Sequence, residues 1–416
     1  MILTAIIALS SARPAAASYR RHHRRHHARR HHVARVPLYH AELLEDADTG
    51  RVLYAQNATL EWPPASMTKL MLMLVVEDEL KAGHVHQDDP VRISWLAAHT
   101  GGSHLGLHEG QVYPLSELMK AALIRSANDA AVAVAQAVCG SVEACVKKMN
   151  LRAQSLGMTD THYGTVEGLP PTPGHDVDYT SAFDMATLGR AIIHHTGLLQ
   201  WTSLAETPFD GGLYMLHNTN HLVGHFEGCD GLKTGFTLNA GFNLTATAIR
   251  GNMRLISIVL GAPSNPERFA VSAKLLEWGF DHFEKVKVLK RGQPLPVHVQ
   301  VESGPLIQPV AQRDLAVVVP KNDLSALKVE YDVPGMINGP VTTGQSVGQV
   351  ILMVGDDVMS SENAVCPLIE PAATRNAAAP NSGENAEAVS VTGAAPSLGN
   401  HAVVVGVTKQ AMQENK

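Results

Sequence analysis

Three short strings of residues from one kind of catalytic site occur in order along this chain. They are Ser66-Met67-Thr68-Lys69, Ser126-Ala127-Asn128 and Lys233-Thr234-Gly235, and their first residues are 60 and 107 positions apart. Together they indicate an acyl-transfer site in which lysine, rather than histidine, activates a serine nucleophile. The chain must therefore fold so that three distant segments meet at one place.

Each string alone is weak evidence, because such short patterns recur by chance. Ser325-Ala326-Leu327-Lys328 repeats the first pattern and Ser361-Glu362-Asn363 the second, but both lie after the lysine–threonine–glycine string. Only one set runs in the required order, and each of its members falls at the boundary of a predicted element. We interpret the later copies as coincidences.

The spacing of the first string suggests how the nucleophile is activated. Ser66 and Lys69 are three apart on a predicted helix, so they share a face. The lysine can accept a proton only when neutral, so its pKa must be lowered, either by burial or by a nearby cation such as Lys233. Pro64-Ala65 places the serine at a helix start, where backbone N–H groups favour an oxyanion. The backbone N–H of Phe236 is a second candidate donor.

The other two strings supply the remaining groups. Ser126 and Asn128 lie in a break between helical stretches, where a hydroxyl can pass a proton to a leaving amine and an amide can hold the substrate. Lys233 adds positive potential and Thr234 can bind a carboxylate. Gly235 allows a substrate backbone to approach closely.

The hydrophobic pattern predicts an α+β fold, an antiparallel sheet flanked by helices with a helical subdomain. Residues 38–54 indicate two strands about the turn Asp48-Thr49-Gly50, and 241–248 and 253–261 indicate neighbouring strands. Helices are predicted over residues 65–82, 115–138 (interrupted at 125–128), 141–156, 184–195 and 267–279, with a loop at 170–175.

The composition changes near Phe283. Short apolar runs at 297–301, 315–319, 327–333 and 347–354 are separated by Gly, Pro and Asn-Gly, a spacing typical of a small β-sandwich. We therefore predict a catalytic domain at residues 37–283 and a β domain at 284–370. Residues 371–416, rich in Ala, Asn, Pro, Ser and Gly, are expected to be a disordered tail.

The N-terminal region has the features of an exported protein. Residues 1–17 combine an apolar stretch with three alanines, as in a signal peptide. Residues 18–36 are predicted to be a disordered tether, within which Arg20–His32 offers weak contact with an anionic envelope surface. Eight of the 33 Lys and Arg residues precede residue 36, leaving 25 against 39 Asp and Glu. This acidic remainder argues against a nucleic-acid partner.

The four cysteines, Cys139, Cys145, Cys229 and Cys366, have no metal-ligand spacing. We expect free, buried thiols, and we predict neither a metal nor a cofactor.

The chain resembles the serine-type D-alanyl-D-alanine carboxypeptidases, the low-molecular-mass penicillin-binding proteins, over residues 38–370. The resemblance rests on Pro64-Ala65-Ser66-Met67-Thr68-Lys69-Leu70, Ser126-Ala127-Asn128-Asp129-Ala130, Gly231-Leu232-Lys233-Thr234-Gly235-Phe236-Thr237, Ala240-Gly241-Phe242-Asn243-Leu244 and Arg254-Leu255-Ile256. It implies a β-lactamase/transpeptidase-like domain followed by the appended β domain.

The family's reaction implies roles for individual residues. Ser66 would attack the bond between the last two D-alanines of a peptidoglycan stem peptide, with Lys69 as base and Ser126 as proton donor. β-Lactams would acylate Ser66 as slowly hydrolysed mimics. Asn128, Lys233, Thr234, Gly235, Phe236, Thr237 and Arg268 would bind the substrate. Arg268, at the place matching a carboxylate-binding arginine, has the alternative of a surface helix residue in a salt bridge.

Two departures from the family pattern stand out. Phe236 replaces the histidine that relatives often have after the lysine–threonine–glycine string. Residues 401–416 are short and lack the broad basic–apolar face of a membrane-lying helix, so the sequence leaves stable anchoring of a periplasmic enzyme open.

Three alternative functions remain. A D,D-endopeptidase uses the same chemistry on cross-links. A β-lactamase needs a deacylating Glu-x-x-Leu-Asn pattern, which the segment 167–178 lacks. An inactive wall-binding scaffold would not need the full set of catalytic groups.

Overall fold

The computed structural model describes residues 39–170, 176–367 and 403–406. The predicted signal peptide (1–17) and the tether (18–36, with Arg20–His32) lie outside them. So do residues 171–175 of the predicted loop and, in the predicted tail, residues 371–402 and 407–416.

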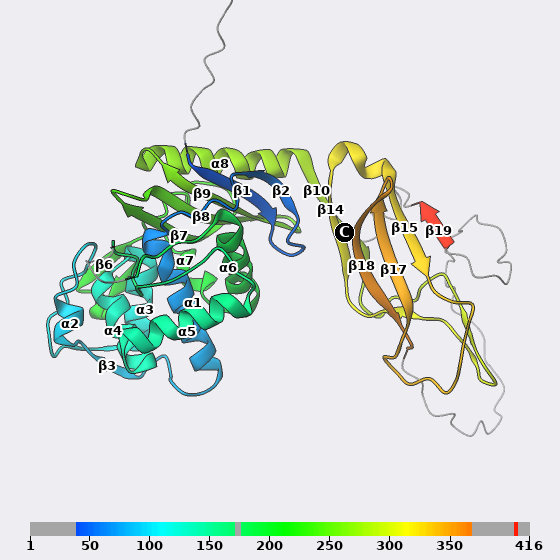
Figure 1. Cartoon of the computed structure of the whole chain (residues 1–416), viewed down its shortest axis with the longest axis horizontal. Coiled ribbons are helices and arrows are strands. Elements are labelled where there is room, and N and C mark those ends of the chain that lie inside the picture. Colours follow the sequence, from blue (N-terminus) through cyan, green and yellow to red (C-terminus); the bar gives the residue numbers. More distant parts are fainter. Residues whose placement is uncertain (1–38, 171–175, 368–402, 407–416) are drawn as a thin grey trace, which may run out of the picture. The chain divides into compact units, whose positions relative to one another are not determined.

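The catalytic part is built on one antiparallel sheet of five strands, in the order β2-β1-β9-β8-β7 (Figure 1). The strands are β1 (Ala41–Asp46), β2 (Val52–Gln56), β7 (Cys229–Thr237), β8 (Gly241–Arg250) and β9 (Met253–Ala262). The two predicted strand pairs, about residues 48–50 and between 248 and 253, are confirmed. The lysine–threonine–glycine string therefore lies on the edge strand β7.

Helices cover both faces of this sheet, with α8 on one face and α6 on the other (Figure 1). The helices are η1 (Ala65–Met67), α1 (Thr68–Lys81), α2 (Trp95–Ala98), α3 (Leu115–Lys120), η2 (Ala121–Arg125), α4 (Asn128–Cys139), α5 (Val142–Ser155), α6 (Ala182–His195), α7 (Leu199–Thr202), η3 (Asp210–Gly212) and α8 (Asn265–His282). Short antiparallel strand pairs are also present. They are β3 (Pro90–Arg92) with β4 (Val112–Pro114), and β5 (Glu206–Phe209) with β6 (Tyr214–His217). The predicted helices and the break at 125–128 are confirmed.

Serine caps explain where several helices begin. The hydroxyl of Ser141 accepts a hydrogen bond from the N–H of Ala144, and the hydroxyl of Ser264 accepts one from Glu267. Each cap satisfies a backbone donor that the first helical turn leaves unpaired.

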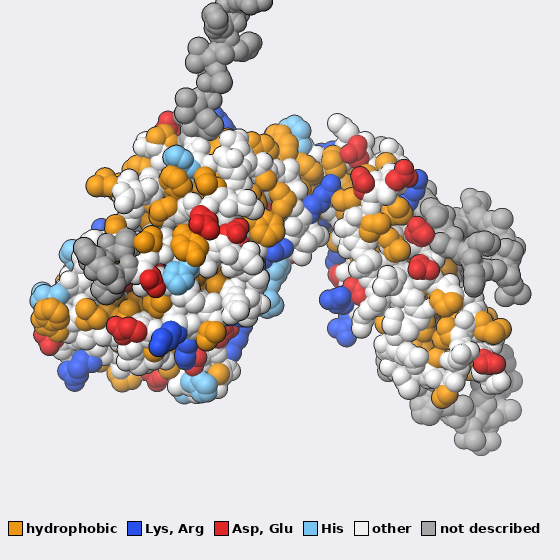
Figure 2. Space-filling view, viewed as in Figure 1, with side chains coloured by type: hydrophobic (Ala, Val, Ile, Leu, Met, Phe, Trp, Pro, Cys, Tyr) orange, Lys and Arg blue, Asp and Glu red, His pale blue; other side chains and the backbone are white. Residues whose placement is uncertain are grey.

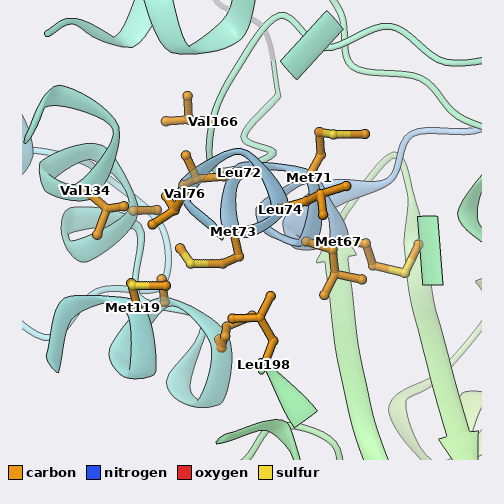
Figure 3. Packing of buried hydrophobic residues seen from close by; sticks show 14 of the residues in the cluster. Met67, Met71, Leu72, Met73, Leu74, Val76, Met119, Val134, Val166 and Leu198 are labelled. Carbon is orange, nitrogen blue, oxygen red and sulfur yellow. The ribbon is translucent and has the colours of Figure 1, made fainter. Parts of the chain in front are cut away.

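Helix α1 forms the centre of the helical core. Every residue from Thr68 to Glu77 is buried, and Figure 3 shows Leu72, Met73 and Val76 packed among side chains of neighbouring elements. A helix that is apolar on all sides is stable only when it is surrounded. Burial of α1 consequently carries Lys69, in its first turn, into the interior.

The β domain has its own core, formed by 18 buried residues between Val286 and Cys366. Its elements are β10 (Phe283–Leu289), β11 (Val299–Val301), β12 (Leu306–Ile307), β13 (Val310–Ala311), β14 (Leu315–Pro320), η4 (Lys321–Ala326), β15 (Leu327–Asp332), β16 (Met336–Ile337), β17 (Ser346–Val354), β18 (Asp357–Val365) and β19 (Val403–Gly406). They form sheets of two, three and five strands, the last in the order β13-β18-β17-β15-β19.

Strand β19 is a difference from prediction. Residues 371–416 were expected to be disordered, but Val403–Gly406 pairs antiparallel with Lys328–Tyr331 of β15. Without β19, β15 would be an edge strand with unpaired backbone groups. The strand was not predicted because the composition of the tail around it is typical of disordered segments.

Within the described residues, no single helix is long and apolar enough to span a membrane. Helices α4 and α5 meet those criteria only as a pair, bent by 83° at the break between them. Figure 2 shows acidic, basic and histidine side chains interspersed with hydrophobic ones over the visible face of the catalytic part.

We predict that Leu72→Ala destabilises the protein by about 2–5 kcal/mol, because a fully buried leucine leaves a cavity in the core around α1. The free energy of unfolding from urea denaturation is the measurement. Leu151→Ala on α5 is the matched control; its side chain is 66 % exposed, and its cost should stay within about 0.5 kcal/mol. Equal costs for the two variants would contradict this account of the core.

Candidate active site

The nucleophile and its predicted base are in contact. The Nζ of Lys69 lies 3.0 Å from the Oγ of Ser66, and the serine is half-buried in η1 while the lysine is fully buried in α1. Ala65 has a φ of 50°, in the left-handed region that non-glycine residues rarely occupy. The chain is therefore bent sharply just before the nucleophile, at the start of the helix.

Two further oxygens orient the amine of Lys69. Its Nζ lies 2.7 Å from the Oδ1 of Asn128 and 2.7 Å from the backbone oxygen of Glu167. A neutral amine has two N–H bonds and one lone pair. When the two N–H bonds are donated to these oxygens, the lone pair faces the hydroxyl of Ser66, which is the orientation a general base requires.

Burial also sets the charge of this lysine. Desolvation lowers the pKa of Lys69 to about 7, against the raising effect of the negative charges of Glu167, Asp178 and Asp129. Of the two expected causes, burial and a cation at Lys233, burial is the dominant one. Lys69 instead affects Lys233: burial is the largest cause that lowers the pKa of Lys233, followed by the charges of Lys69 and Arg268.

The second string lies where two helices meet. Helix η2 ends at Arg125, and the next residue, Ser126, is buried and has a φ of 67°. Asn128 begins α4, and its Nδ2 donates to the backbone oxygen of Gly101 at 2.7 Å while its Oδ1 accepts from Lys69. The left-handed backbone of Ser126 is strained, and such strain persists only where the surrounding structure enforces it. Asn128 is thus held at both ends of its amide and directly orients the lysine.

The third string borders the nucleophile along β7. Lys233 is buried, with its Nζ donating to the backbone oxygen of Thr234, whose hydroxyl donates to that of Thr219 at 2.7 Å. A Cβ on Gly235 would lie 2.4 Å from the backbone oxygen of Pro64. Glycine was expected here for the approach of substrate. The structure shows that its missing side chain lets β7 pack against the turn that carries the serine.

Phe236 and Thr237 follow on the same strand. The ring of Phe236 is 47 % exposed and stacks on Phe242 with centroids 4.2 Å apart. The hydroxyl of Thr237 accepts a hydrogen bond from the N–H of Ala240, which closes the β7–β8 turn. A cavity of about 50 Å³ lies beside Thr237 and is also lined by Ala65 and Leu169.

Arg268 reaches this strand from α8. It is 6 % exposed, and its Nη1 donates to the backbone oxygens of Gly235, at 3.0 Å, and Asn243, at 3.2 Å. Within the described residues its hydrogen bonds go to backbone oxygens and none goes to a carboxylate, and its buried Nε has no hydrogen-bond partner. The alternative of a surface residue in a salt bridge is therefore wrong. Burial lowers the pKa of the guanidinium to about 10.

Two residues of the site, one glycine and one aspartate, were not identified from the sequence. A Cβ on Gly168 would lie 2.0 Å from the backbone oxygen of Ala65, so only glycine lets this loop reach the nucleophile turn. The carboxylate of Asp178 accepts hydrogen bonds from the hydroxyls of Thr68 and Thr165 and ties the same loop to α1. No motif marked either residue, because both act through the folded loop.

Asn243 is a third residue whose role the sequence did not show, although it lies in a stretch that carries the family resemblance. Its Nδ2 donates to the backbone oxygens of Pro63 and Pro64, and its Oδ1 accepts from the N–H of Gly261. It thereby links β8 to the segment before the nucleophile.

The other copies of the strings lie in the β domain. Ser325 in η4 and Lys328 in β15 are both exposed, and Ser361 and Asn363 belong to β18. Within the described ranges there is no group of three or more His, Cys, Asp or Glu side chains placed to hold a metal ion.

Comparison with known proteins agrees with this arrangement. Residues 35–264 match the family model described as D-alanyl-D-alanine carboxypeptidase, and residues 283–369 match that of the penicillin-binding protein 5 C-terminal domain. The chain is 35 % identical to the D-alanyl-D-alanine carboxypeptidase DacF of Bacillus subtilis over 76 % of this chain and 82 % of that protein. It is 35 % identical to DacA of Escherichia coli K12, over 76 % and 80 %.

Solved structures show the same likeness. Penicillin-binding protein 5 of Haemophilus influenzae is 31 % identical with a TM-score of 0.72, covering 80 % of this chain and 97 % of that one. Penicillin-binding protein D2 of Listeria monocytogenes in its ampicillin-bound form is 33 % identical with a TM-score of 0.54, covering 58 % and 97 %. The chain belongs to the D-alanyl-D-alanine carboxypeptidase family of penicillin-binding proteins.

Proposed function

We propose that this protein removes the terminal D-alanine from peptidoglycan stem pentapeptides through an acyl-enzyme on Ser66. The observation that carries the proposal is the buried amine of Lys69, 3.0 Å from the hydroxyl of Ser66 and oriented by two oxygens. Family membership supports the reaction class.

In the acylation step, the Nζ of Lys69 takes the hydroxyl proton as the Oγ of Ser66 attacks the carbonyl carbon between the two D-alanines. The developing oxyanion accepts hydrogen bonds from the backbone N–H groups of Ser66 and Phe236. Because Gly235 packs against Pro64, these two N–H groups belong to segments in contact.

When the tetrahedral intermediate collapses, the leaving amine of D-alanine takes the proton held by Lys69 through the hydroxyl of Ser126. An ester remains on Ser66. Water then attacks the ester and releases the shortened peptide. The strained backbone at Ser126 supports this role, because strain of this kind clusters at functional sites.

Basic and hydroxyl side chains of the site are proposed to bind the terminal carboxylate of the substrate. Lys233 and Arg268 are buried, and within the described part of the chain their printed hydrogen bonds go to backbone oxygens rather than to carboxylates. Thr234 lies on β7 between Lys233 and Gly235, and the backbone oxygen of Gly235 accepts from Arg268. A buried guanidinium without an anionic partner is costly, and an incoming carboxylate offsets that cost. Asn128 and Thr237 complete the proposed binding set.

The same site is proposed to bind β-lactams, as the ampicillin-bound form of the Listeria relative indicates for that protein. An exported enzyme of the bacterial envelope fits this substrate. The predicted signal peptide supports that location, and contact of residues 20–32 with an anionic surface remains a proposal.

Product analysis distinguishes the proposed activity from its rivals. Purified protein incubated with a pentapeptide ending in D-Ala-D-Ala is expected to release D-alanine, and fluorescent penicillin is expected to label it stably. Cleavage of cross-linked muropeptides in preference to the pentapeptide would point to an endopeptidase. Rapid penicillin turnover would point to a β-lactamase, and absence of both labelling and release to a scaffold.

Lys69→Ala is expected to lower the rate of penicillin labelling by roughly 10²–10⁴-fold, since the base is lost. Lys328→Ala, from the exposed second copy of the pattern, is the matched control and should label normally. Circular dichroism must show that both variants are folded. Normal labelling of a folded Lys69→Ala protein would refute the assignment of the base.

The acylation rate should depend on pH through Lys69. Because burial lowers its pKa to about 7, the amine is neutral and active above that pH and protonated below it. We expect the second-order rate of penicillin acylation, measured from pH 5 to 9, to rise through about pH 7 and then level off. A rate that is unchanged between pH 5 and pH 9, or that begins to rise only near pH 9, would contradict this assignment.

A further inference from the structure

Aromatic rings hold the guanidinium of Arg268. Its central carbon lies 5.5 Å from the ring centroid of Phe242 on β8 and 4.9 Å from that of Phe269, the next residue on α8. With the hydrogen bonds from Nη1 to the backbone oxygens of Gly235 and Asn243, four groups from two strands and a helix restrict this side chain.

The stack extends beyond these two rings. Phe242 pairs with Phe236 across the β7–β8 ladder, and their rings stack 4.2 Å apart. On the other side, Phe269 stacks on His221 with centroids 5.1 Å apart. Phe242 and Phe269 are thus supported by neighbouring rings, and the guanidinium has well-defined contact surfaces.

Carbonyl oxygens and ring faces stabilise a cation without cancelling its charge. A carboxylate partner would neutralise the guanidinium and compete with an incoming anion. Ring faces attract the guanidinium through their quadrupole and carry no net charge. The buried Nε of Arg268 also has no hydrogen-bond partner. This environment holds the arginine in place while its positive charge stays available.

We propose that Phe242 and Phe269 form an aromatic clamp that fixes Arg268 for recognition of the substrate's C-terminal carboxylate. The two phenylalanines are positioning residues, because they act through the arginine. The inference rests on the proposed function, in which Arg268 binds that carboxylate.

The test compares two substrates that differ only in the group to be recognised, a peptide ending in D-Ala-D-Ala and its C-terminal amide. Phe242→Leu removes the ring but keeps an apolar side chain. We expect it to lower the ratio of kcat/KM for the acid to kcat/KM for the amide by roughly three- to tenfold, mainly through KM of the acid. Phe242→Tyr keeps a ring and should restore the ratio.

Phe280→Leu is the matched control. Phe280 lies on α8 and also contacts an arginine, since the central carbon of Arg250 is 4.7 Å from its ring, but that arginine is paired with Glu277. This variant should keep the wild-type ratio. Thermal unfolding of each variant separates a loss of folding from a loss of recognition.

Arg268→Gln distinguishes failure of the clamp from failure of the proposed function. If Arg268→Gln lowers the ratio and folded Phe242→Leu does not, the clamp is refuted while the carboxylate role of the arginine stands. If Arg268→Gln leaves the ratio unchanged, the carboxylate role itself is wrong, and the clamp inference falls with it. A lowered ratio in both, with rescue by Phe242→Tyr, supports the clamp.

Discussion

The burial of one lysine amine is the constraint on which the rest of this site depends. A charged ammonium in the core of α1 would be costly, so Lys69 tends toward its neutral form, and a neutral lysine is a base. The oxygens of Asn128 and Glu167 then direct its lone pair toward Ser66. The same two hydrogen bonds therefore serve both purposes: they give the buried amine partners, and they orient it toward the serine.

The two other buried basic side chains of the site have different surroundings. Lys233 donates to a backbone oxygen, and Arg268 is held by backbone oxygens and two aromatic rings. Carboxylates gather around Lys69, where Glu167, Asp178 and Asp129 oppose the effect of burial on its pKa. The charge distribution therefore separates a proton-accepting side from a side suited to binding an anion.

Much of this site was predictable because its chemistry is encoded in local spacing. Ser66 and Lys69 share a helix face whatever the rest of the fold does, and a break between helices at Ser126 follows from the apolar pattern around it. The roles of Gly235 and Asn243 were not predictable in this way. Gly235 packs against Pro64, and Asn243 bonds to that same segment, across more than 170 residues of chain. Such contacts leave no periodic signal in the sequence.

The amino-acid pattern alone was enough to predict the reaction class, most helices and strands, and the proposed nucleophile and base. These follow from residue types at fixed local separations, which the backbone geometry of a helix or strand converts directly into proximity. Three features became visible only in the folded chain: burial dominates the lowering of the pKa of Lys69, Asn128 contacts its amine, and aromatic rings hold Arg268. Desolvation and long-range packing arise when distant segments exclude water together, so no single stretch of sequence contains them.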